Sequence, residues 1–392
     1  MNEIHPFFEP PAPKGQPAFA QPLHVGRPNI GDRRKLMARI EGLLDRRWLS
    51  NNGPLVQEFE QQMAGYLGVK HCIPICNGTV ALELAICALG LEGEVILPSY
   101  TFVATAHALQ WQGITPVFAD IAPGTFNLDP AAVERMITPR TTGIIGVHVW
   151  GQPCAVEALQ ALADQHHLQL MFDAAHAFGC SHGGRMIGNF GRCEVFSFHA
   201  TKFFNTFEGG AIATNDDALA EKLRLMKNFG FHGPDNIIYL GVNGKMTEVC
   251  AAMGLTGLES LDEFMDINRR NHESYARALA GIPGLRLIEY SRAEKCNRQY
   301  VVVEVAAEAY GLSRDETVAR LHAENVLARK YFWPGCHRME PYRTLYPDAG
   351  LALPQTERIA PRMVVLPTGT GVDGAAIETI GGLLRSWHQG AG

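Results

Sequence analysis

Two residues at the ends of hydrophobic segments could take part in covalent chemistry, Asp173 and Lys202. The segment LMFDAAHAFG places Asp173 directly after an apolar run, and EVFSFHATKFFNTFEGGAIAT places Lys202 between an apolar run and two glycines. A buried ammonium is costly unless it reaches water or its nitrogen is used chemically. If the two apolar runs are neighbouring parallel strands, the carboxylate and the amine face one crevice at the carboxyl edge of the sheet.

Each of these residues also has an ordinary structural explanation. Asp173 precedes the segment AAHA and could cap a helix, which is the more frequent use of such an aspartate. Lys202 could extend its ammonium from the end of a strand into solvent. The chemical alternative is a Schiff-base lysine, whose amine becomes nucleophilic at neutral pH when it is desolvated. Its aromatic neighbours Phe198, Phe203 and Phe204 could supply that desolvation.

Two further junctions between a predicted strand and a predicted helix could bind a ligand. The segment ICNGTVALELA puts Asn77, Gly78 and Thr79 at a helix start, where free backbone N–H groups stabilise a phosphate. The segment LPSYTFVATAHAL puts Tyr100 and Phe102 where a flat ligand could stack, although most aromatic side chains serve in core packing. The chain has neither an ATP P-loop motif nor GxGxxG, so these nucleotide sites are not indicated.

A single ligand would account for all of these junctions. It needs a phosphate at residues 77–79, a planar ring against Phe102, a ring nitrogen that Asp173 keeps protonated, and an aldehyde that reacts with Lys202. Pyridoxal 5'-phosphate (PLP) has these features. We therefore predict a PLP site in which Asp173 and Lys202 are catalytic.

The composition restricts the class of protein. The chain has 392 residues, of which 46% are hydrophobic and 19% charged, with a net charge of −6, as expected for a soluble globular protein with no nucleic-acid partner. No apolar run approaches the roughly 18 residues of a membrane span. Nine cysteines without CxxC pairs favour reduced thiols and no metal site, and the N-terminus lacks the apolar stretch of a signal peptide. We expect a cytoplasmic protein.

Alternating patterns predict an α/β fold. Helical segments separate apolar strands at 71–76, 94–99, 115–121, 141–149, 168–175, 194–199 and 210–215, which indicates a mainly parallel seven-stranded sheet covered on both faces. The segment GLESLDEFMDINRRNHESYARALAGI then predicts one long helix, followed by strands and helices of a smaller α+β domain. We divide the chain into an N-terminal arm (1–29), a large PLP-binding domain (30–257) and a small C-terminal domain (258–392).

Several motifs, in order, resemble the sugar aminotransferases of the DegT/DnrJ/EryC1/StrS family. They are NGTVAL, PSYTFVATAHA, DAAHAFG, SFHATK with a following EGG, and NGKMTEVCAAMGL, and the similarity runs from about residue 25 to about residue 385. The resemblance implies fold type I of the PLP-dependent transferases. The segments SFHATKFFNTFEGGA, NGKM and YFWPGCHRMEPYR look most like members that aminate C4 of a dTDP-4-keto-6-deoxyhexose, with L-glutamate as amino donor and 2-oxoglutarate as product.

The resemblance implies roles at named positions around the cofactor. Lys202 would form the Schiff base and move the proton, and Asp173 would pair with the pyridinium nitrogen. The remaining cofactor contacts would come from Asn77, Gly78, Thr79, Phe102, His176, Ser197 and Asn243.

The same resemblance implies a homodimer with shared active sites, because Asn243 matches an asparagine that the other subunit sends to the phosphate. Many members carry an arginine where this chain has Lys245, which could still meet a nucleotide phosphate but as a point charge. His199, Tyr331 and His337 match substrate-facing positions. Tyr331 and His337 could instead be packing or surface residues.

Three other functions stay open at this point. The 3-dehydratase branch of the family carries histidine at the position of Lys202, which argues against dehydration. Transamination at C3 of a sugar, or of a cyclitol, is compatible with the same motifs. A regulatory protein without catalytic activity could share the fold, since fold does not determine function.

Overall fold

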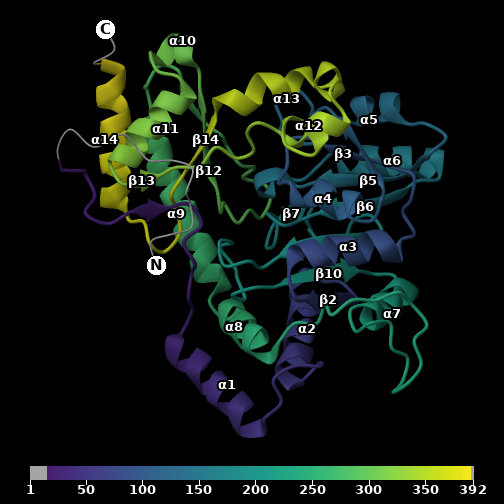
Figure 1. Ribbon diagram of the computed structural model, residues 1–392. Coiled ribbons are helices and arrows are strands. Elements are labelled where there is room, and N and C mark those ends of the chain that lie inside the picture. Colours follow the sequence, from purple (N-terminus) through teal and green to yellow (C-terminus); the bar gives the residue numbers. More distant parts are fainter. Residues whose placement is uncertain (1–15, 390–392) are drawn as a thin grey trace.

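A seven-stranded sheet forms the centre of the computed structural model, which describes residues 16–389 (Figure 1). Its strand order is β2-β10-β9-β6-β5-β3-β4, and only β10 runs antiparallel to its neighbours. The predicted α/β class and the mainly parallel sheet of seven strands are thereby confirmed. The strands are β2 (His71–Ile75), β3 (Glu94–Pro98), β4 (Thr115–Ala119), β5 (Thr141–Val147), β6 (Gln169–Asp173), β9 (Cys193–Ser197) and β10 (Gly210–Thr214).

Helices cover both faces of this sheet, because successive strand residues point to opposite sides. Met171 and Phe172 of β6 illustrate the alternation, since they belong to two different hydrophobic clusters. One face is covered by α1 (Arg33–Arg46), α2 (Pro54–Leu67), α5 (Pro130–Met136), α6 (Val156–His166) and α8 (Glu248–Leu258). The other is covered by α3 (Gly78–Ala88), α4 (Ala104–Gln110) and α7 (Asp217–Met226).

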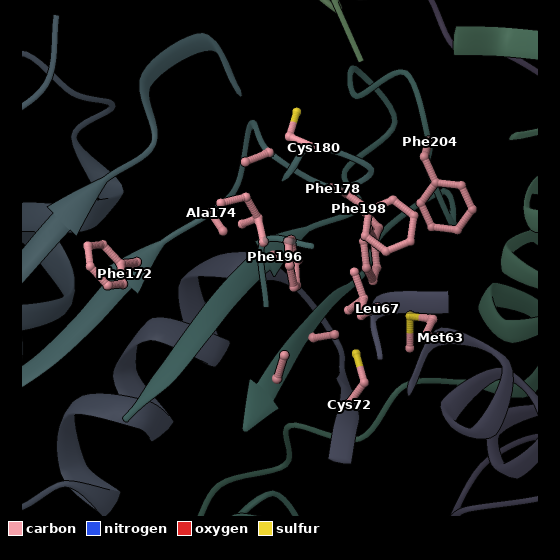
Figure 2. Close-up of a cluster of buried hydrophobic side chains, with 14 of the residues drawn as sticks. Met63, Leu67, Cys72, Phe172, Ala174, Phe178, Cys180, Phe196, Phe198 and Phe204 are labelled. Atoms are coloured by element: carbon pink, nitrogen blue, oxygen red, sulfur yellow. The ribbon is translucent and has the colours of Figure 1, made fainter. Parts of the chain in front are cut away.

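An aromatic cluster supports the loop that carries Lys202 (Figure 2). The ring of Phe198 packs edge-on against Phe204 at 5.1 Å between centroids, and Phe178 stacks on Phe204 at 4.6 Å. Phe198, Phe203 and Phe204 are all buried. Their rings anchor both ends of the 198–204 segment in the core, so the lysine between them is held on a rigid base.

The C-terminal part of the chain forms a second, smaller sheet (Figure 1). Its antiparallel order is β11-β12-β14, with β11 (Leu285–Leu287), β12 (Val301–Val305) and β14 (Met363–Leu366). Apolar residues of α9 (Leu261–Leu279), α11 (Arg314–Ala323) and α14 (Gly374–Gln389) pack with those of this sheet in one cluster. Shorter helices in this part are α10 (Ala307–Tyr310), α12 (Tyr342–Leu345) and α13 (Pro354–Ile359).

The predicted long helix is present as α9, but it begins at Leu261 and not at Gly257. Helix α8 ends at Leu258 and α9 begins at Leu261, with Glu259 and Ser260 between them. The acidic residues Asp262 and Glu263 lie in the first turn of α9, where they stabilise a new helix start through its dipole. We propose the domain boundary at residue 258, beside this break.

The N-terminal arm is attached to the small domain. Strand β1 (Leu23–His24) pairs in parallel with β13 (Val326–Leu327). Asn29 then joins two regions, since its side chain donates to Phe203 O at 2.9 Å and accepts from Thr370 Oγ1 at 2.8 Å. Residues 1–15 of the predicted arm lie outside the described residues. Among residues 16–389, no helix combines the length and the apolar character needed to span a membrane.

Candidate active site

Asp173 ends β6 at the carboxyl edge of the sheet, as predicted, and is 5% exposed. Its Oδ2 accepts from Thr105 Oγ1 at 2.8 Å, and its Oδ1 accepts from the N–H of Ala175 at 3.0 Å. Burial raises the pKa of Asp173, while these two donors and the Lys202 ammonium act in the opposite direction. The side chain is thus held in one orientation by two donors, at the position expected for a ligand in a parallel sheet.

Lys202 follows β9, the strand next to β6, and its amine is close enough to Asp173 for each group to shift the pKa of the other. Its Nζ donates to the hydroxyl of Tyr300 at 3.4 Å. Burial lowers the pKa of Lys202 to about 8, against the opposing effects of Asp173 and Tyr331. A substantial fraction of this amine is therefore neutral, and nucleophilic, slightly above neutral pH.

His176 is a buried neutral imidazole beside these two residues. Its Nδ1 accepts from the backbone N–H of Trp150 at 3.2 Å, so the ring proton must lie on Nε2. The ring stacks on Phe332 at 5.4 Å and meets Tyr300 edge-on at 5.0 Å. Burial lowers the pKa of His176 well below its ordinary value, and Lys202 adds to this. The imidazole is fixed as an Nε2–H donor.

A phosphate cradle lies where β2 meets α3. Asn77 caps α3, accepting from the N–H of Val80 at 2.9 Å, which leaves the first N–H groups of the helix, those of Gly78 and Thr79, without an intrahelical partner. A Cβ at Gly78 would lie 2.9 Å from the Cβ of Ser197, and one at Gly210 would lie 2.8 Å from the Gly78 nitrogen. Glycine at these two positions therefore brings the hydroxyl of Ser197 next to the turn.

Phe102 lies in the loop between β3 and α4 and is 56% exposed, so its ring is free to cover a flat ligand. The next turn carries Thr105, whose hydroxyl binds Asp173. This loop thus links the predicted stacking residue to the carboxylate. Phe102 belongs to the same edge of the sheet as Asp173 and Lys202.

The residues predicted to face substrate lie in different environments. Tyr331 is half-buried with its ring 6.2 Å from that of Tyr300, and burial raises its pKa while Lys202 opposes the shift. His199 is exposed, with Nδ1 2.8 Å from Thr201 Oγ1 and Nε2 3.4 Å from a carboxylate oxygen of Glu208.

Asn243 and Lys245 lie at the outer edge of the sheet, beside β2. The backbone of Lys245 forms an antiparallel β-bridge with Ile75. Its Nζ donates to Asn228 Oδ1 at 2.9 Å and lies 4.6 Å from the centroid of the Phe229 ring. Asn243 is exposed, and its backbone forms an antiparallel β-bridge with Asn228. The structure therefore places these two predicted site residues beside the end of β2, and among residues 16–389 no hydrogen bond joins either side chain to Lys202.

The prediction that His337 faces substrate is at odds with its position. The residue is 3% exposed, its Nδ1 lies 2.6 Å from Ser99 Oγ and its Nε2 lies 2.6 Å from Glu357 Oε1. Both ring nitrogens are used to join the 336–338 turn to β3 and α13. His337 is the packing residue that the alternative interpretation described.

Three residues of the site were not predicted, Thr105, Tyr300 and Trp150. Thr105 stands inside the PSYTFVATAHA motif, so a search for donors to Asp173 could have considered it. Tyr300 comes from the start of β12, far along the chain. Trp150 has a positive φ of 57°, which is uncommon for a large side chain. Its backbone N–H donates to Nδ1 of His176. No local pattern signals either role.

The donor set fits PLP. The cradle of Asn77, Gly78 and Ser197 offers N–H and hydroxyl donors that a phosphate requires, and the glycine keeps it open. Asp173 is a buried carboxylate able to hold a proton on a ring nitrogen, and Lys202 is an amine of lowered pKa.

Comparisons with known proteins agree with this chemistry. Residues 31–385 match the DegT/DnrJ/EryC1/StrS aminotransferase family. A dTDP-4-amino-4,6-dideoxy-D-glucose transaminase of Shigella dysenteriae is 37% identical over 365 residues, covering 93% of this chain and 99% of the relative. A GDP-perosamine synthase of Caulobacter vibrioides is 37% identical over 342 residues, covering 86% and 91%.

Two solved structures are similar along nearly the whole chain. DesI, crystallised in the presence of its TDP-sugar product, superposes with a TM-score of 0.92 at 50% identity, covering 96% of each chain. DesV of S. venezuelae, in complex with a ketimine intermediate, gives a TM-score of 0.84 at 31% identity, covering 91% of this chain and 95% of the other. The predicted resemblance to the sugar aminotransferases of this family is thereby confirmed. The chain belongs to the DegT/DnrJ/EryC1/StrS aminotransferase family and is a PLP-dependent aminotransferase of fold type I.

Proposed function

We propose that this aminotransferase transfers the amino group of L-glutamate to C4 of dTDP-4-keto-6-deoxy-D-glucose. The names of relatives support this substrate class, since two of them, 37% and 34% identical, are dTDP-4-amino-4,6-dideoxy-D-glucose transaminases and a 50% identical structure was solved with its TDP-sugar product. The observation that supports transamination is the proximity of the Lys202 amine to the buried carboxylate of Asp173, at the same edge of the sheet as the phosphate cradle.

The residues around the cradle would hold the cofactor in one orientation. The N–H groups of Gly78 and Thr79 and the hydroxyl of Ser197 bind its phosphate, Phe102 covers one face of its ring, and Asp173 keeps a proton on its ring nitrogen. When bound, PLP supplies the aldehyde that exchanges amines and a ring that withdraws electrons. His176 contributes an Nε2–H donor toward the same space.

Lys202 is the residue that moves the proton. Its amine has a pKa of about 8, so it can accept and return a proton near neutral pH at Nζ. The hydroxyl of Tyr300, 3.4 Å away, orients this nitrogen. A positioned amine of this kind contributes about 10²–10⁴-fold to a proton-transfer step.

A homodimer with shared sites completes the proposal. Among residues 16–389 neither Asn243 nor Lys245 is hydrogen-bonded to Lys202, so we assign both to the site of a second copy, where Asn243 meets the cofactor phosphate and Lys245 the nucleotide phosphates. Exposed apolar side chains on α1, just after it, and on the 229–242 segment form a surface that a second copy would cover. They are Met37, Leu44, Trp48, Phe229, Ile237, Ile238, Leu240 and Val242.

Subunit mixing tests this arrangement. A dimer that combines a Lys202→Ala chain with an Asn243→Ala chain has one site with both defects and one site with neither. We expect the mixture to recover up to about a quarter of the wild-type rate, although each variant alone is nearly inactive. A mixture no more active than its parents would contradict shared sites.

The remaining substrate contacts and the compartment are also proposed. Tyr331, beside Tyr300, and His199, on the loop that carries Lys202, face the sugar nucleotide. The nine cysteines are all unpaired thiols, which fits a reducing compartment such as the cytoplasm.

A substrate screen tests the function directly. The protein is loaded with pyridoxamine 5'-phosphate and offered 4-keto and 3-keto sugar nucleotides with dTDP, UDP or GDP, and a keto cyclitol, and the amino product is scored by mass. We expect the dTDP-4-keto-6-deoxyglucose reaction to be fastest. Preferred amination of a 3-keto sugar or of the cyclitol would replace the proposed substrate.

A further inference from the structure

A cavity of about 540 Å³ opens between α2, α7 and the segment around Lys245. None of the proposed PLP contacts lines it. Its charged lining consists of Lys70, Arg224, Lys227 and Lys245 with a single carboxylate, Glu60, although the whole chain carries a net charge of −6. The other polar residues of the lining are asparagines and glutamines, which can also donate hydrogen bonds.

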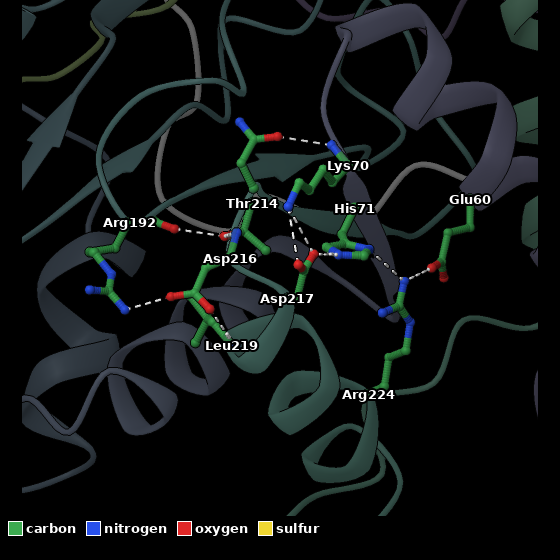
Figure 3. A network of polar contacts seen from close by, with 10 residues as sticks. Glu60, Lys70, His71, Arg192, Thr214, Asp216, Asp217, Leu219 and Arg224 are labelled. Carbon is green, nitrogen blue, oxygen red and sulfur yellow. Dashed lines mark hydrogen bonds and ion pairs between the residues drawn. The ribbon is translucent and has the colours of Figure 1, made fainter.

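Two of the four cations are neutralised by a network of ion pairs (Figure 3). One carboxylate oxygen of Asp217 lies 3.1 Å from the Lys70 ammonium, and the other lies 2.9 Å from Nε2 of His71. Glu60 binds the guanidinium of Arg224. Within residues 16–389, Lys227 and Lys245 have no carboxylate within 4.0 Å, so the cavity retains two uncompensated ammonium groups.

Lys227 is the more unusual of the two because it is only 6% exposed. Its ammonium has three donors, and its hydrogen bond is to Pro74 O at 3.3 Å. Burial lowers its pKa to about 8, Glu60 opposes the shift, and Arg224 and Lys245 add to it. A buried ammonium with donors to spare, facing a cavity with further cations, is suited to an anion with several acceptor oxygens.

We propose that this cavity binds a phosphate group, with Lys227 at its base. A phosphate presents three or more oxygens, which match the ammonium of Lys227 and the surrounding amides, and lysine binds phosphate as a point charge. The volume lies in the range of sites for small ligands. Inorganic phosphate and the phosphate of a small metabolite share this chemistry. Gly78, Thr79 and Ser197 of the PLP cradle do not line this cavity.

Calorimetric titration of inorganic phosphate into the PLP-loaded protein, at constant ionic strength, tests the proposal. The bound cofactor fills the cradle, so that site does not contribute. We expect saturable binding in the millimolar range or tighter, weakened at least tenfold in Lys227→Met. The control is Lys222→Met in α7, the helix that directly precedes Lys227, since Lys222 donates to Ala88 O and does not line the cavity. Unchanged binding by Lys227→Met, or no binding to the wild type at 10 mM, would overturn the proposal.

Glu60→Gln gives a second test, in which we expect a gain of phosphate affinity and not a loss. Removal of the only carboxylate of the lining frees Arg224, and we expect phosphate to bind several-fold more tightly. If Lys227→Met does not fold, Glu60→Gln is sufficient as a test. An affinity for phosphate equal to that of the wild type would then overturn the proposal. Transamination should persist in Glu60→Gln, which separates this proposal from the proposed function. Replacing phosphate by a sugar phosphate in the same titrations shows which source binds more tightly through Lys227.

Discussion

The lysines at positions 202 and 227 have similar ionisation but different surroundings. Burial lowers the pKa of each to about 8. Lys202 lies at the carboxyl edge of the sheet, next to Asp173 and Tyr300, with a phosphate cradle nearby. Lys227 follows α7 and donates to a backbone carbonyl. A lowered pKa therefore does not identify a catalytic lysine, whereas its combination with an acid and a cofactor cradle does.

The largest difference between the two regions should appear in the rate of amino transfer when each lysine is replaced. We expect Lys202→Ala to lower the rate of amino transfer from L-glutamate by at least about 10³-fold, because the only amine placed to move the proton is lost. Lys227→Met should stay within about twofold of the wild-type rate. Both rates are measured by single-turnover absorbance of the cofactor. A Lys202→Ala variant that keeps a tenth of the activity would remove the distinction.

Asp173→Asn tests whether the carboxylate is what makes the first region catalytic. The carboxamide keeps the size and the Thr105 hydrogen bond but has no charge to hold a proton on the ring nitrogen. We expect kcat to fall by about 10²-fold, equivalent to about 2.7 kcal/mol of barrier. Thr105→Val is the milder control, since it removes one donor to Asp173 and leaves the charge. Near-normal turnover by Asp173→Asn would contradict the assignment.

Tyr300→Phe should change the ionisation of Lys202 and leave that of Lys227 unchanged. It removes the hydroxyl that accepts from Nζ, a contact that favours the charged amine, so the pKa of Lys202 should fall further and kcat should decrease by about fivefold. Titration of the lysine Cε signals by ¹³C NMR, in cofactor-free protein, follows both amines. The signal of Lys227 should not move. Equal shifts of both signals would indicate a general structural change.

Lys227→Met should have the smallest effect, a gain in stability. The pKa of Lys227 falls from 10.5 to about 8 on folding, so the folded state binds the proton less tightly than the unfolded state. The ammonium therefore destabilises the fold below pH 8, and this penalty disappears as the pH rises toward 10.5. We expect the variant to gain about 1 kcal/mol at pH 7, because lost contacts to Pro74 and Glu60 offset part of the relief.

Urea unfolding at pH 7 and at pH 9.5 measures this gain. The difference between Lys227→Met and the wild type should shrink at the higher pH. A difference that stays constant between the two pH values would show that folding does not lower the pKa of Lys227.

Much of the fold could be predicted because parallel strands buried on both faces are continuous apolar runs, bounded by helical patterns. Asp173 and Lys202 were identifiable because each directly follows such a run, and residues after parallel strands meet at one edge. The helix break at Ser260 was missed because the apolar pattern continues across it. His337 was misplaced because its partners, Ser99 and Glu357, are remote in sequence.

The sequence by itself determined which residues could bind PLP and in what order they occur, since strand ends, a capped helix start and glycines are local features. Only the tertiary structure decided that Tyr300 reaches Lys202, that Trp150 orients His176 and that Lys227 faces a cationic cavity. Those contacts depend on how the small domain packs on the sheet, on the turn at Trp150, and on the ion pair by which Arg224 of α7 meets Glu60 of α2. Such packing joins distant segments by burial and shape, which no short stretch of residues encodes.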